Sequence, residues 1–391
     1  GVIFASGLNS AGRRGIDGYA GGERLEVEGL NLRGSLFGTA ETSVNSGEIW
    51  AEAMGGTATG VKLDSSGANT DVFQNSGLVV AVGDSQGRDD SQSFLSFGRA
   101  TGVSLTGGTV FENTETGQVI AESDRDAVGV YLSNVRFRDK PYAVRNDGLI
   151  EANSVGDPSD GHVSYGVFIQ NFESGLGIFE NHGTVTADFA VYATFRSGAS
   201  PRQRPGEAVL NMESGILNGD VVLNEGFDRL ENSGVINGTV NMGEDADVVL
   251  NVGGTINGTV FLGQGADEFR GGDGPEIVSG GFSNDQIYGG GGDDLLSGGQ
   301  GRDFIEGGAG NDGLFGELGS DILISEGGDY IDAGAGEDLI QSTDTSFQRL
   351  EGGSGHDIWE LPVDDQTYSL GLIAASGRVS GIDEVRLNAG H

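Results

Sequence analysis

The sequence contains no cysteine, so neither disulfide bonds nor thiol chemistry contribute to its fold or function. Basic residues are also scarce, because 21 lysines and arginines stand against 59 aspartates and glutamates and leave a formal net charge of −38. A surface of that sign repels nucleic acids and anionic lipid headgroups and attracts cations. No apolar run approaches the ~18 residues of a membrane-spanning helix. No segment of about 10 residues or more has the periodicity of an amphipathic helix, which argues against a doubly wound α/β fold.

Glycine, by contrast, is abundant, and 73 copies suit a solenoid better than several globular cores. Residues 280–315 form an unbroken series of nine-residue units: GGFSNDQIY, GGGGDDLLS, GGQGRDFIE and GGAGNDGLF. Each unit opens with glycines that accept positive φ, carries a carboxylate at its sixth position and closes with a short β-prone triplet. Two units make one coil, so we expect Asp285 to stack on Asp303, and Asp294 on Asp312.

These stacked carboxylates predict a bound cation. Two carboxylates at that spacing repel each other unless a cation lies between them, and glycine turns aim backbone carbonyls toward the same place. Calcium prefers six to eight oxygen ligands, whereas zinc and copper favour the His and Cys side chains that these turns lack. The turns therefore predict several Ca²⁺ ions as part of the fold, and we expect residues 262–360 to unfold without them.

Weaker copies of the turn extend the pattern along two edges of the coil. One edge carries carboxylates at Asp228, Asp247, Asp267, Asp285, Asp303, Asp321, Asp338 and Asp357. The opposite edge carries Asn-Gly turns at Asn218, Asn237 and Asn257, followed by Glu276, Asp294, Asp312 and Asp329. For Asp228 and Asp247, a solvated turn without metal explains the pattern as well as a calcium ligand does.

The nonapeptides resemble the GGxGxDxUx repeat of the RTX family of calcium-binding proteins, over about residues 262–360. The resemblance implies a narrow β-roll in which each ion takes carbonyls at positions two and four and the Asp of one turn. It takes carbonyls at positions one and three and the Asp of the next turn as well. One ion would thus be bound by Gly281, Ser283, Asp285, Gly298, Gln300 and Asp303, and one on the other edge by Gly290, Gly292, Asp294, Gly307, Ala309 and Asp312.

Applied to the whole array, the resemblance implies the following metal-binding residues: Gly263, Gly265, Asp267, Gly272, Gly274, Glu276, Gly280, Gly281, Phe282, Ser283, Asp285, Gly289, Gly290, Gly291, Gly292, Asp294, Gly298, Gly299, Gln300, Gly301, Asp303, Gly307, Gly308, Ala309, Gly310, Asp312, Gly316, Leu318, Asp321, Asp329, Asp338 and Asp357.

A second repeat precedes the nonapeptides, in which an Asn-x-Gly turn leads into a β-branched run. Its turn glycines are spaced 30, 40, 31, 35, 32, 19 and 20 residues apart, at Gly47, Gly77, Gly117, Gly148, Gly183, Gly215, Gly234 and Gly254. Long periods are typical of wide parallel β-helix coils with loops, and shorter ones of lean coils. This part resembles the coils of secreted bacterial β-helices such as autotransporter passengers.

The predicted fold is therefore all-β: a right-handed parallel β-helix tapering into an RTX calcium β-roll, as one continuous solenoid with a small C-terminal β cap. We expect the parallel β-helix in 1–222, transition rungs and the β-roll in 223–360, and the cap or a secretion-signal region in 361–391. Within the last segment, TYSLGLI and GIDEVRLNA are candidate strands that would close the open end of the coil.

The N-terminal half offers one candidate glycan-binding strand, with Arg136, Arg138, Lys140 and Tyr142 alternating onto one face. This arrangement resembles polysaccharide lyases and mannuronan epimerases, with His162, Tyr165 and His182 as candidate helpers. The compact Tyr/Asp/His signature of the epimerases is absent, and arginines on an acidic protein more often pair with neighbouring carboxylates. We assign no catalytic residue.

Two functions follow from these patterns. The first, which we favour, is a secreted calcium-binding solenoid with an extracellular structural or adhesive role, in a surface layer, filament, matrix or adhesin. Its expected partners are calcium and either further copies of itself or an extracellular polysaccharide or cell surface. The alternative is a lyase or epimerase that acts on an anionic glycan through the N-terminal β-helix.

Overall fold

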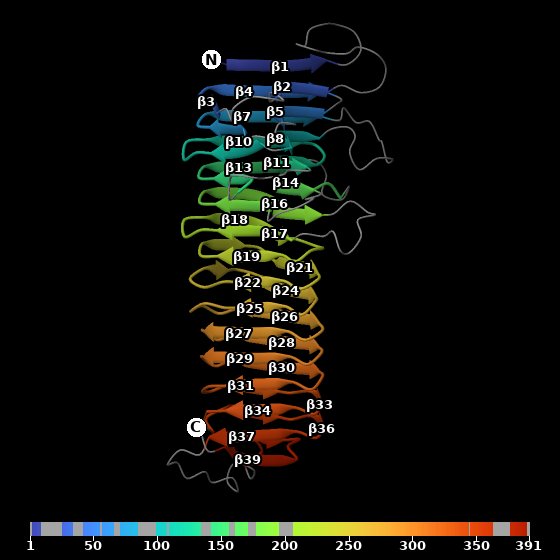
Figure 1. Ribbon diagram of the computed structural model, residues 1–391, viewed down its shortest axis with the longest axis vertical. Helices are drawn as coiled ribbons and strands as arrows, with labels where there is room; N and C mark the ends of the chain where they lie inside the picture. The colour runs from blue at the N-terminus through green and yellow to red at the C-terminus, as the bar shows by residue number, and fades with distance from the viewer. Residues whose placement is uncertain are drawn as a thin grey trace. The chain divides into compact units, whose positions relative to one another are not determined.

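The computed structural model describes residues 2–8, 26–33, 42–54, 57–65, 71–84, 99–107, 109–133, 142–155, 161–170, 177–194, 206–343, 345–362 and 376–388 (Figure 1). All regular secondary structure in these ranges is β-strand, as predicted. The chain divides into two compact units, Gly1–Leu223 and Asn224–His391. In the described ranges there is no helix with the length and apolar character needed to span a membrane.

The first unit is a parallel β-helix whose strands stack in three rows. One row holds β3 (Thr42–Asn45), β6 (Asp71–Asn75), β9 (Thr109–Asn113), β12 (Val144–Asn146), β15 (Gly177–Asn181) and β17 (Glu207–Asn211). The second holds β1 (Val2–Leu8), β4 (Glu48–Met54), β7 (Leu78–Asp84), β10 (Gln118–Ser123) and β13 (Leu149–Ser154). The third holds β2 (Glu26–Arg33), β5 (Thr57–Ser65), β8 (Ala100–Gly107), β11 (Ala127–Ser133) and β14 (Ser164–Gln170).

Two strands join the second and third rows. The long β16 (Thr184–Thr194) pairs with β13 through its first residues and with β14 through its last ones. The next strand, β18 (Ile216–Val222), pairs with β16 along both parts. The three-sided coil therefore becomes narrower at this end of the first unit.

Strand register in this unit equals the predicted spacing of the turn glycines. The second-row partners follow one another after 30, 40, 31, 35 and 32 residues, in the order Glu48, Leu78, Gln118, Leu149, Thr184 and Ile216. The glycine spacing thus gives the length of each coil.

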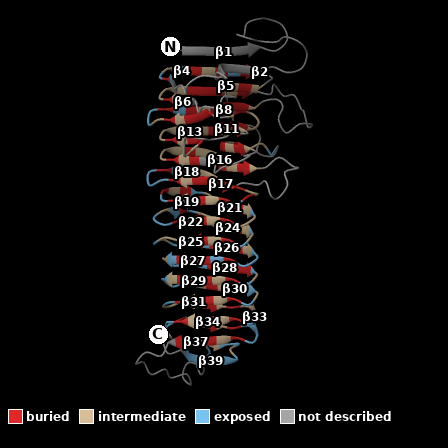
Figure 2. Ribbon diagram, in the orientation of Figure 1, coloured by how far each residue is buried: buried red, intermediate tan, exposed pale blue. Residues whose placement is uncertain are grey.

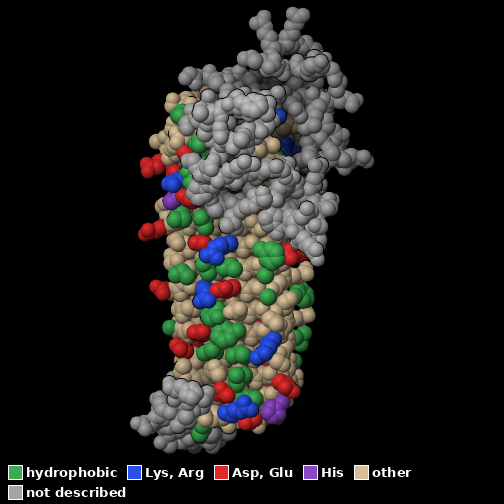
Figure 3. Space-filling model, in the orientation of Figure 1, with side chains coloured by type: hydrophobic (Ala, Val, Ile, Leu, Met, Phe, Trp, Pro, Cys, Tyr) green, Lys and Arg blue, Asp and Glu red, His purple; other side chains and the backbone are tan. Residues whose placement is uncertain are grey.

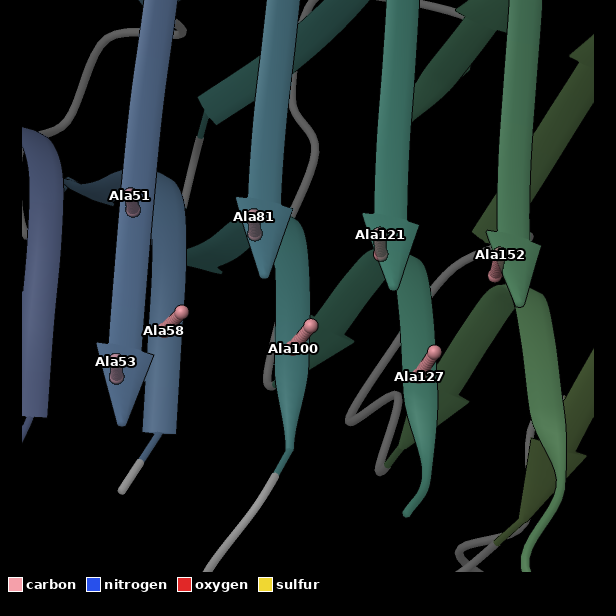
Figure 4. Packing of buried hydrophobic residues seen from close by; sticks show 8 residues of the cluster. All are labelled: Ala51, Ala53, Ala58, Ala81, Ala100, Ala121, Ala127 and Ala152. Atoms are coloured by element: carbon pink, nitrogen blue, oxygen red, sulfur yellow. The ribbon is translucent and has the colours of Figure 1, made fainter. Parts of the chain in front are cut away.

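The core of the first unit consists of columns of identical or similar residues, one from each coil (Figure 2). Figure 4 shows two columns of buried alanines near the corner between the second and third rows. The column in the second row consists of Ala51, Ala81, Ala121 and Ala152. The column in the third row consists of Ala58, Ala100 and Ala127. A glycine column in the third row has a steric cause. A Cβ on Gly60 would lie 2.6 Å from Val79 Cγ1 and 2.7 Å from the carbonyl oxygen of Gly102.

The Asn-x-Gly turns contain a ladder of buried asparagine side chains. Each Nδ2 donates a hydrogen bond of 2.8 to 2.9 Å to Oδ1 of the asparagine one coil further on, through Asn45, Asn75, Asn113, Asn146, Asn181 and Asn211. The same amide also reaches turn carbonyls; Asn113 Nδ2, for example, donates to Gly117 O at 3.2 Å. Because an amide both donates and accepts, this ladder is satisfied without any ion. The sequence pattern located these turns but did not reveal the side-chain ladder.

The second unit is a narrower parallel solenoid with two rows of strands. The first row holds β19 (Arg229–Asn232), β22 (Val248–Leu250), β25 (Glu268–Arg270), β27 (Gln286–Gly291), β29 (Phe304–Ala309), β31 (Ile322–Ser325), β34 (Leu339–Ser342), β37 (Ile358–Pro362) and β39 (Glu384–Asn388). The second holds β20 (Val235–Asn237), β21 (Val240–Glu244), β23 (Thr255–Ile256), β24 (Thr259–Gln264), β26 (Ile277–Phe282), β28 (Leu295–Gln300), β30 (Gly313–Leu318), β32 (Tyr330–Asp332), β33 (Ala335–Gly336), β35 (Arg349–Glu351), β36 (Ser354–Gly355) and β38 (Val379–Ser380).

The nonapeptide coils have the predicted register of 18 residues, since Gly281 pairs with Gly299 and Gly290 with Gly308. Their core is thin. Each coil contributes mainly one buried apolar side chain per row, such as Ile287, Leu296 and Ile305. So small an apolar core offsets little of the conformational entropy of a glycine-rich chain.

Of the two candidate C-terminal strands, only the second lies in the described residues. TYSLGLI, residues 367–373, lies outside the described residues. GIDEVRLNA contains β39, which pairs in parallel with β37 and so adds a rung to the coil. Before it, β38 pairs with β35.

We predict that Asn146→Asp destabilises the first unit by about 2–3 kcal/mol, because a carboxylate cannot donate to Asn181 Oδ1 and places a charge in a buried ladder. The measurement is urea unfolding in calcium, followed by circular dichroism. Asn153→Asp is the matched control, because the Asn153 amide donates at a half-buried surface position to Glu151 Oε1. Equal losses in both variants would contradict a special role for the ladder.

Candidate metal centre

One edge of the second unit carries a continuous ladder of buried aspartates, here called the aspartate edge. In each step a backbone N–H donates to a carboxylate oxygen one coil further on, over 2.7 to 3.1 Å. Asp285 N, for example, donates to Asp303 Oδ1 at 2.8 Å. The side chains are at most 2% exposed, and the ladder consists of Asp228, Asp247, Asp267, Asp285, Asp303, Asp321, Asp338 and Asp357, ending on Asp383.

The opposite edge changes from amides to carboxylates and is called the mixed edge. Asn232 Nδ2 donates to Asn251 Oδ1 at 2.7 Å, and Asn251 Nδ2 donates to Glu276 Oε1 at 3.0 Å. Beyond this point backbone N–H groups take over as donors. Glu276 N donates to Asp294 Oδ1 and Asp294 N to Asp312 Oδ1, at 2.8 and 2.9 Å.

These ladders leave the second oxygen of most carboxylates without a protein partner. The buried oxygens concerned are Oδ2 of Asp247, Asp267, Asp285, Asp294, Asp303, Asp312, Asp321, Asp338 and Asp357, and Oε2 of Glu276. A buried, unpaired carboxylate oxygen is costly unless a proton or a cation compensates it. This repeated feature is the first evidence that a cation fits here.

Glycine at the first position of a turn makes room beside that oxygen. A Cβ on Gly280 would lie 2.5 Å from Asp285 Oδ2 and 2.5 Å from Gly298 O, so the two oxygens approach a common point. Gly289 has the same relation to Asp294 Oδ2 and to a carbonyl of the next coil. Only glycine leaves this space free for an ion.

Backbone conformation supplies further oxygens around the same turns. Gly281, Gly290 and Gly299 have φ of 108°, 101° and 102°, and Ser283 has φ of 80° without being glycine. Among the described residues no three His, Cys, Asp or Glu side chains converge, so an ion at these turns takes most of its ligands from backbone carbonyls. An all-oxygen set of carboxylates and carbonyls suits calcium.

The predicted ligand turns differ in the residue at their first position and in the partners of their carboxylates. The turns of Asp267 and Asp338 carry Leu262 and Ala333 at the position that Gly280 occupies in its own turn. Asp329 accepts from Asp312 N at 2.8 Å, but its Oδ2 also accepts from Ser325 Oγ at 2.7 Å and Glu326 N at 3.1 Å. The remaining predicted turns, from Glu276 to Asp321, have glycine at this position.

Two sequence-based interpretations need correction. Asp228 and Asp247 are not solvated turn residues, because they are 2% and 1% exposed and belong to the aspartate edge. The side chain preceding Glu276 on the mixed edge is Asn251, whereas Asn257 and Asn237 bond to each other at an exposed position. The Asn-x-Gly spacing of the first unit, repeated at 232–234, would have identified the correct amides; the Asn-Gly dipeptides did not.

Burial shifts the acidity of the ladder carboxyls. Desolvation, with the neighbouring carboxylates Asp267 and Asp303 as smaller contributors, raises the pKa of Asp285 to about 8. Burial likewise raises the pKa of Asp321 to about 7 and that of Asp247 to about 9. It also raises the pKa of Glu276 and Asp294. All these raised pKa values mean that the buried site disfavours an ionised carboxylate without a partner. A bound cation would stabilise the ionised form.

Comparison with known families agrees with this geometry. The family model of the RTX calcium-binding nonapeptide repeat (4 copies) matches five stretches between residues 252 and 343, most of them overlapping: 252–287, 261–296, 270–305, 288–323 and 325–343. These residues are RTX repeats. The comparison with curated proteins gave no match. RTX repeats bind calcium, and the buried carboxylates of both edges fit several ions.

The candidate glycan-binding strand is only partly visible. Arg136, Arg138 and Lys140 lie outside the described residues. The Tyr142 hydroxyl donates to Glu112 Oε1 at 2.8 Å, and burial together with Glu112 raises the pKa of Tyr142 to about 12. Arg145, next to this strand, pairs with Asp147 at 3.0 Å and with Glu180 at 3.2 Å.

The other candidate residues, His162, Tyr165 and His182, also contact neighbouring side chains. His182 lies 2.8 Å from Glu180 and His162 lies 3.6 Å from Asp126, while Tyr165 packs among aromatic rings. The described candidates fall into two groups, with Tyr142 and His182 near Glu180, and His162 and Tyr165 near Asp126.

We predict that Gly280→Ala weakens calcium binding by about tenfold or more, because the added methyl group fills the space between Asp285 Oδ2 and Gly298 O. Gly280 is outside the positive-φ region, so its own φ suits alanine, and the clash falls on Asp285 Oδ2 and the carbonyl oxygen of Gly298. Gly291→Ala is the matched control, since its nearest neighbouring atom would be 3.7 Å away. Calorimetric calcium titration compares the two, and equal affinities would contradict the assignment.

When the calcium-free chain is held folded, calcium uptake at pH 7 should release protons, because Asp285 and Asp321 have raised pKa values in that fold and must ionise to bind the ion. The release should disappear near pH 10, above those values. The same shifts make the calcium-free fold more stable below the ordinary pKa of aspartate and less stable as pH rises through about 8. A pH-stat titration measures the protons, and uptake without release at pH 7 would be the contrary result.

Proposed function

We propose that this protein is a secreted calcium-binding solenoid with an extracellular structural or adhesive role, as part of a surface layer, filament, matrix or adhesin. The observation that carries this proposal is the series of buried carboxylates with uncompensated oxygens along both edges of the second unit. Such a fold needs calcium at the concentration found outside cells, where sites of moderate affinity are filled. In a cell interior with little calcium the same carboxylates would repel one another.

Calcium bound in these turns would supply positive charge and accept oxygen ligands. The chain contributes the Oδ2 atoms and carbonyls of consecutive coils, so that occupancy of a turn ties one rung to the next. Residues such as Gly280 and Gly298 keep that space open, and Asp303 belongs to two successive steps of the ladder. In a chain exported without calcium, the second unit would fold and stiffen after export, when its turns bind the ion.

Exposed apolar side chains support self-association through the second unit. On the second unit Phe261, Ile277, Phe282, Leu295 and Leu318 are 44% to 55% exposed, despite the strongly acidic composition. Figure 3 shows hydrophobic side chains along one face of this unit, between acidic and basic ones. Apolar surface of this kind is typical of protein interaction sites.

The described N-terminal residues do not favour proton abstraction. A general base needs a pKa near the working pH, whereas the pKa of the hydrogen-bonded Tyr142 is raised to about 12. The two histidines of this region each face an acidic partner at separate places. This supports the structural role over a lyase or epimerase.

We predict that Asp303→Asn abolishes calcium-induced assembly, or moves it to at least about tenfold higher calcium. The asparagine can still accept from Asp285 N, so the ladder bond remains while the charged oxygen is lost. Asp293→Asn is the control, because Asp293 is exposed and accepts from Asn311 N outside the ladder. Light scattering and electron microscopy follow assembly, and circular dichroism follows folding.

Two results would overturn the proposal. One is assembly of Asp303→Asn at the wild-type calcium concentration. The other is turnover of a uronate polysaccharide by the wild type that Tyr142→Phe abolishes while calcium-induced assembly stays intact. The second result would establish the enzymatic alternative.

A further inference from the structure

The aspartate edge continues past the end of the matched repeats. Asp338 N donates to Asp357 Oδ1 at 3.1 Å, and Asp357 N donates to Asp383 Oδ2 at 3.1 Å. The repeat match ends at residue 343, and residues 376–388 contain no nonapeptide. The last step of the ladder therefore joins a coil to a segment of unrelated sequence.

The glycine-lined space seen in the repeats recurs at this step. A Cβ on Gly352 would lie 2.9 Å from Asp357 Oδ2 and still closer to the carbonyl oxygen of Gly381. Asp357 is fully buried, and its Oδ2 has no hydrogen-bond partner. Gly381 has φ of 67°, a conformation that turns its carbonyl toward the coil without the strain another residue would meet.

Direct hydrogen bonds hold residues 376–388 against the last coil, but they leave Asp357 Oδ2 without a partner. Asp383 N and Glu384 N both donate to Asp357 O, at 3.0 and 3.1 Å. Gly352 N donates to Ser380 O at 3.0 Å, and Arg378 Nη1 donates to Phe347 O at 2.8 Å. None of these donors reaches Asp357 Oδ2.

We propose a calcium site formed by Gly352, Asp357, Gly381 and Asp383, which fastens residues 376–388 to the last coil. Its donors are carboxylate and carbonyl oxygens, and water can complete the shell because Asp383 is exposed. The bound ion compensates Asp357 Oδ2 and couples docking of the C-terminal segment to calcium. The inference depends on calcium binding by the second unit and is independent of its extracellular role.

Trp359 gives this site a spectroscopic probe. It follows Asp357 by two residues, so their Cα atoms lie within about 7 Å. The ring is buried, with Nε1 bonded to Ser342 Oγ at 2.8 Å. Terbium replaces calcium in oxygen sites and emits when a nearby tryptophan is excited, and the sequence has only one other tryptophan, Trp50 in the first unit.

The experiment titrates the full-length protein with terbium in a Trp50→Phe background, exciting tryptophan alone. Asp357→Asn and Asp383→Asn should each lower the affinity for terbium, measured by the tryptophan-sensitised emission, by about tenfold or more. Glu384→Gln is the matched control, since Glu384 is exposed and pairs with Arg386 on the same strand. The proposal would be overturned if Asp357→Asn bound terbium with the wild-type affinity. It would also be overturned if Glu384→Gln lost as much terbium affinity as Asp357→Asn.

Limited proteolysis with trypsin supplies a second measurement that does not depend on emission. In calcium, Arg378 and Arg386 of the wild type should resist cleavage, and Asp357→Asn should be cut there at least about tenfold faster while the repeats stay protected. Circular dichroism confirms that the repeats of the variant remain folded. Cleavage at Arg378 that is equally slow in Asp357→Asn, at limiting calcium, would show that the segment docks without the ion.

Discussion

The second unit depends on one asymmetric interaction: a backbone N–H that donates to only one oxygen of a buried carboxylate. In the step from Asp285 to Asp303 this bond fixes the register of neighbouring coils over 2.8 Å, and it leaves Oδ2 of the acceptor uncompensated. An aspartate can accept but cannot donate, so no repetition of this step completes the hydrogen bonding. The fold is thereby incomplete without a cation or a proton, and calcium binding becomes part of its stability.

The first unit shows the same ladder with a different chemistry. Asn113 donates to Asn146 and accepts from Asn75, and each inner amide of the series, from Asn75 to Asn181, has such a donor and acceptor in the neighbouring coils. The wide coils of this unit bury valine, leucine and phenylalanine from three rows in addition to the alanines, whereas the second unit has two rows with mainly one buried apolar side chain per coil in each. Amide pairing together with a larger apolar core predicts that this unit folds without metal.

Periodicity determined most of what could be predicted, because strand register follows directly from it. The glycine spacing gave each coil length of the first unit, and the nonapeptides gave the pairing of Gly281 with Gly299. The buried asparagines were not predicted, since burial depends on which side of a turn faces the core. The link from Asp357 to Asp383 could not be predicted either, because Asp383 lies outside any repeat and reaches the ladder only through folding of the last coil.

Within the second unit, the mixed edge shows how one type of ladder converts into the other. Asn251 is the last amide, and its Nδ2 donates to Oε1 of Glu276, the first carboxylate. From Glu276 onward the donor is the backbone, and the free oxygen appears at the same residue. A single exchange of amide for acid therefore marks where this edge begins to require calcium. At Asp329 the second oxygen is instead satisfied by Ser325 and Glu326, so the buried oxygens without a protein partner on this edge belong to Glu276, Asp294 and Asp312.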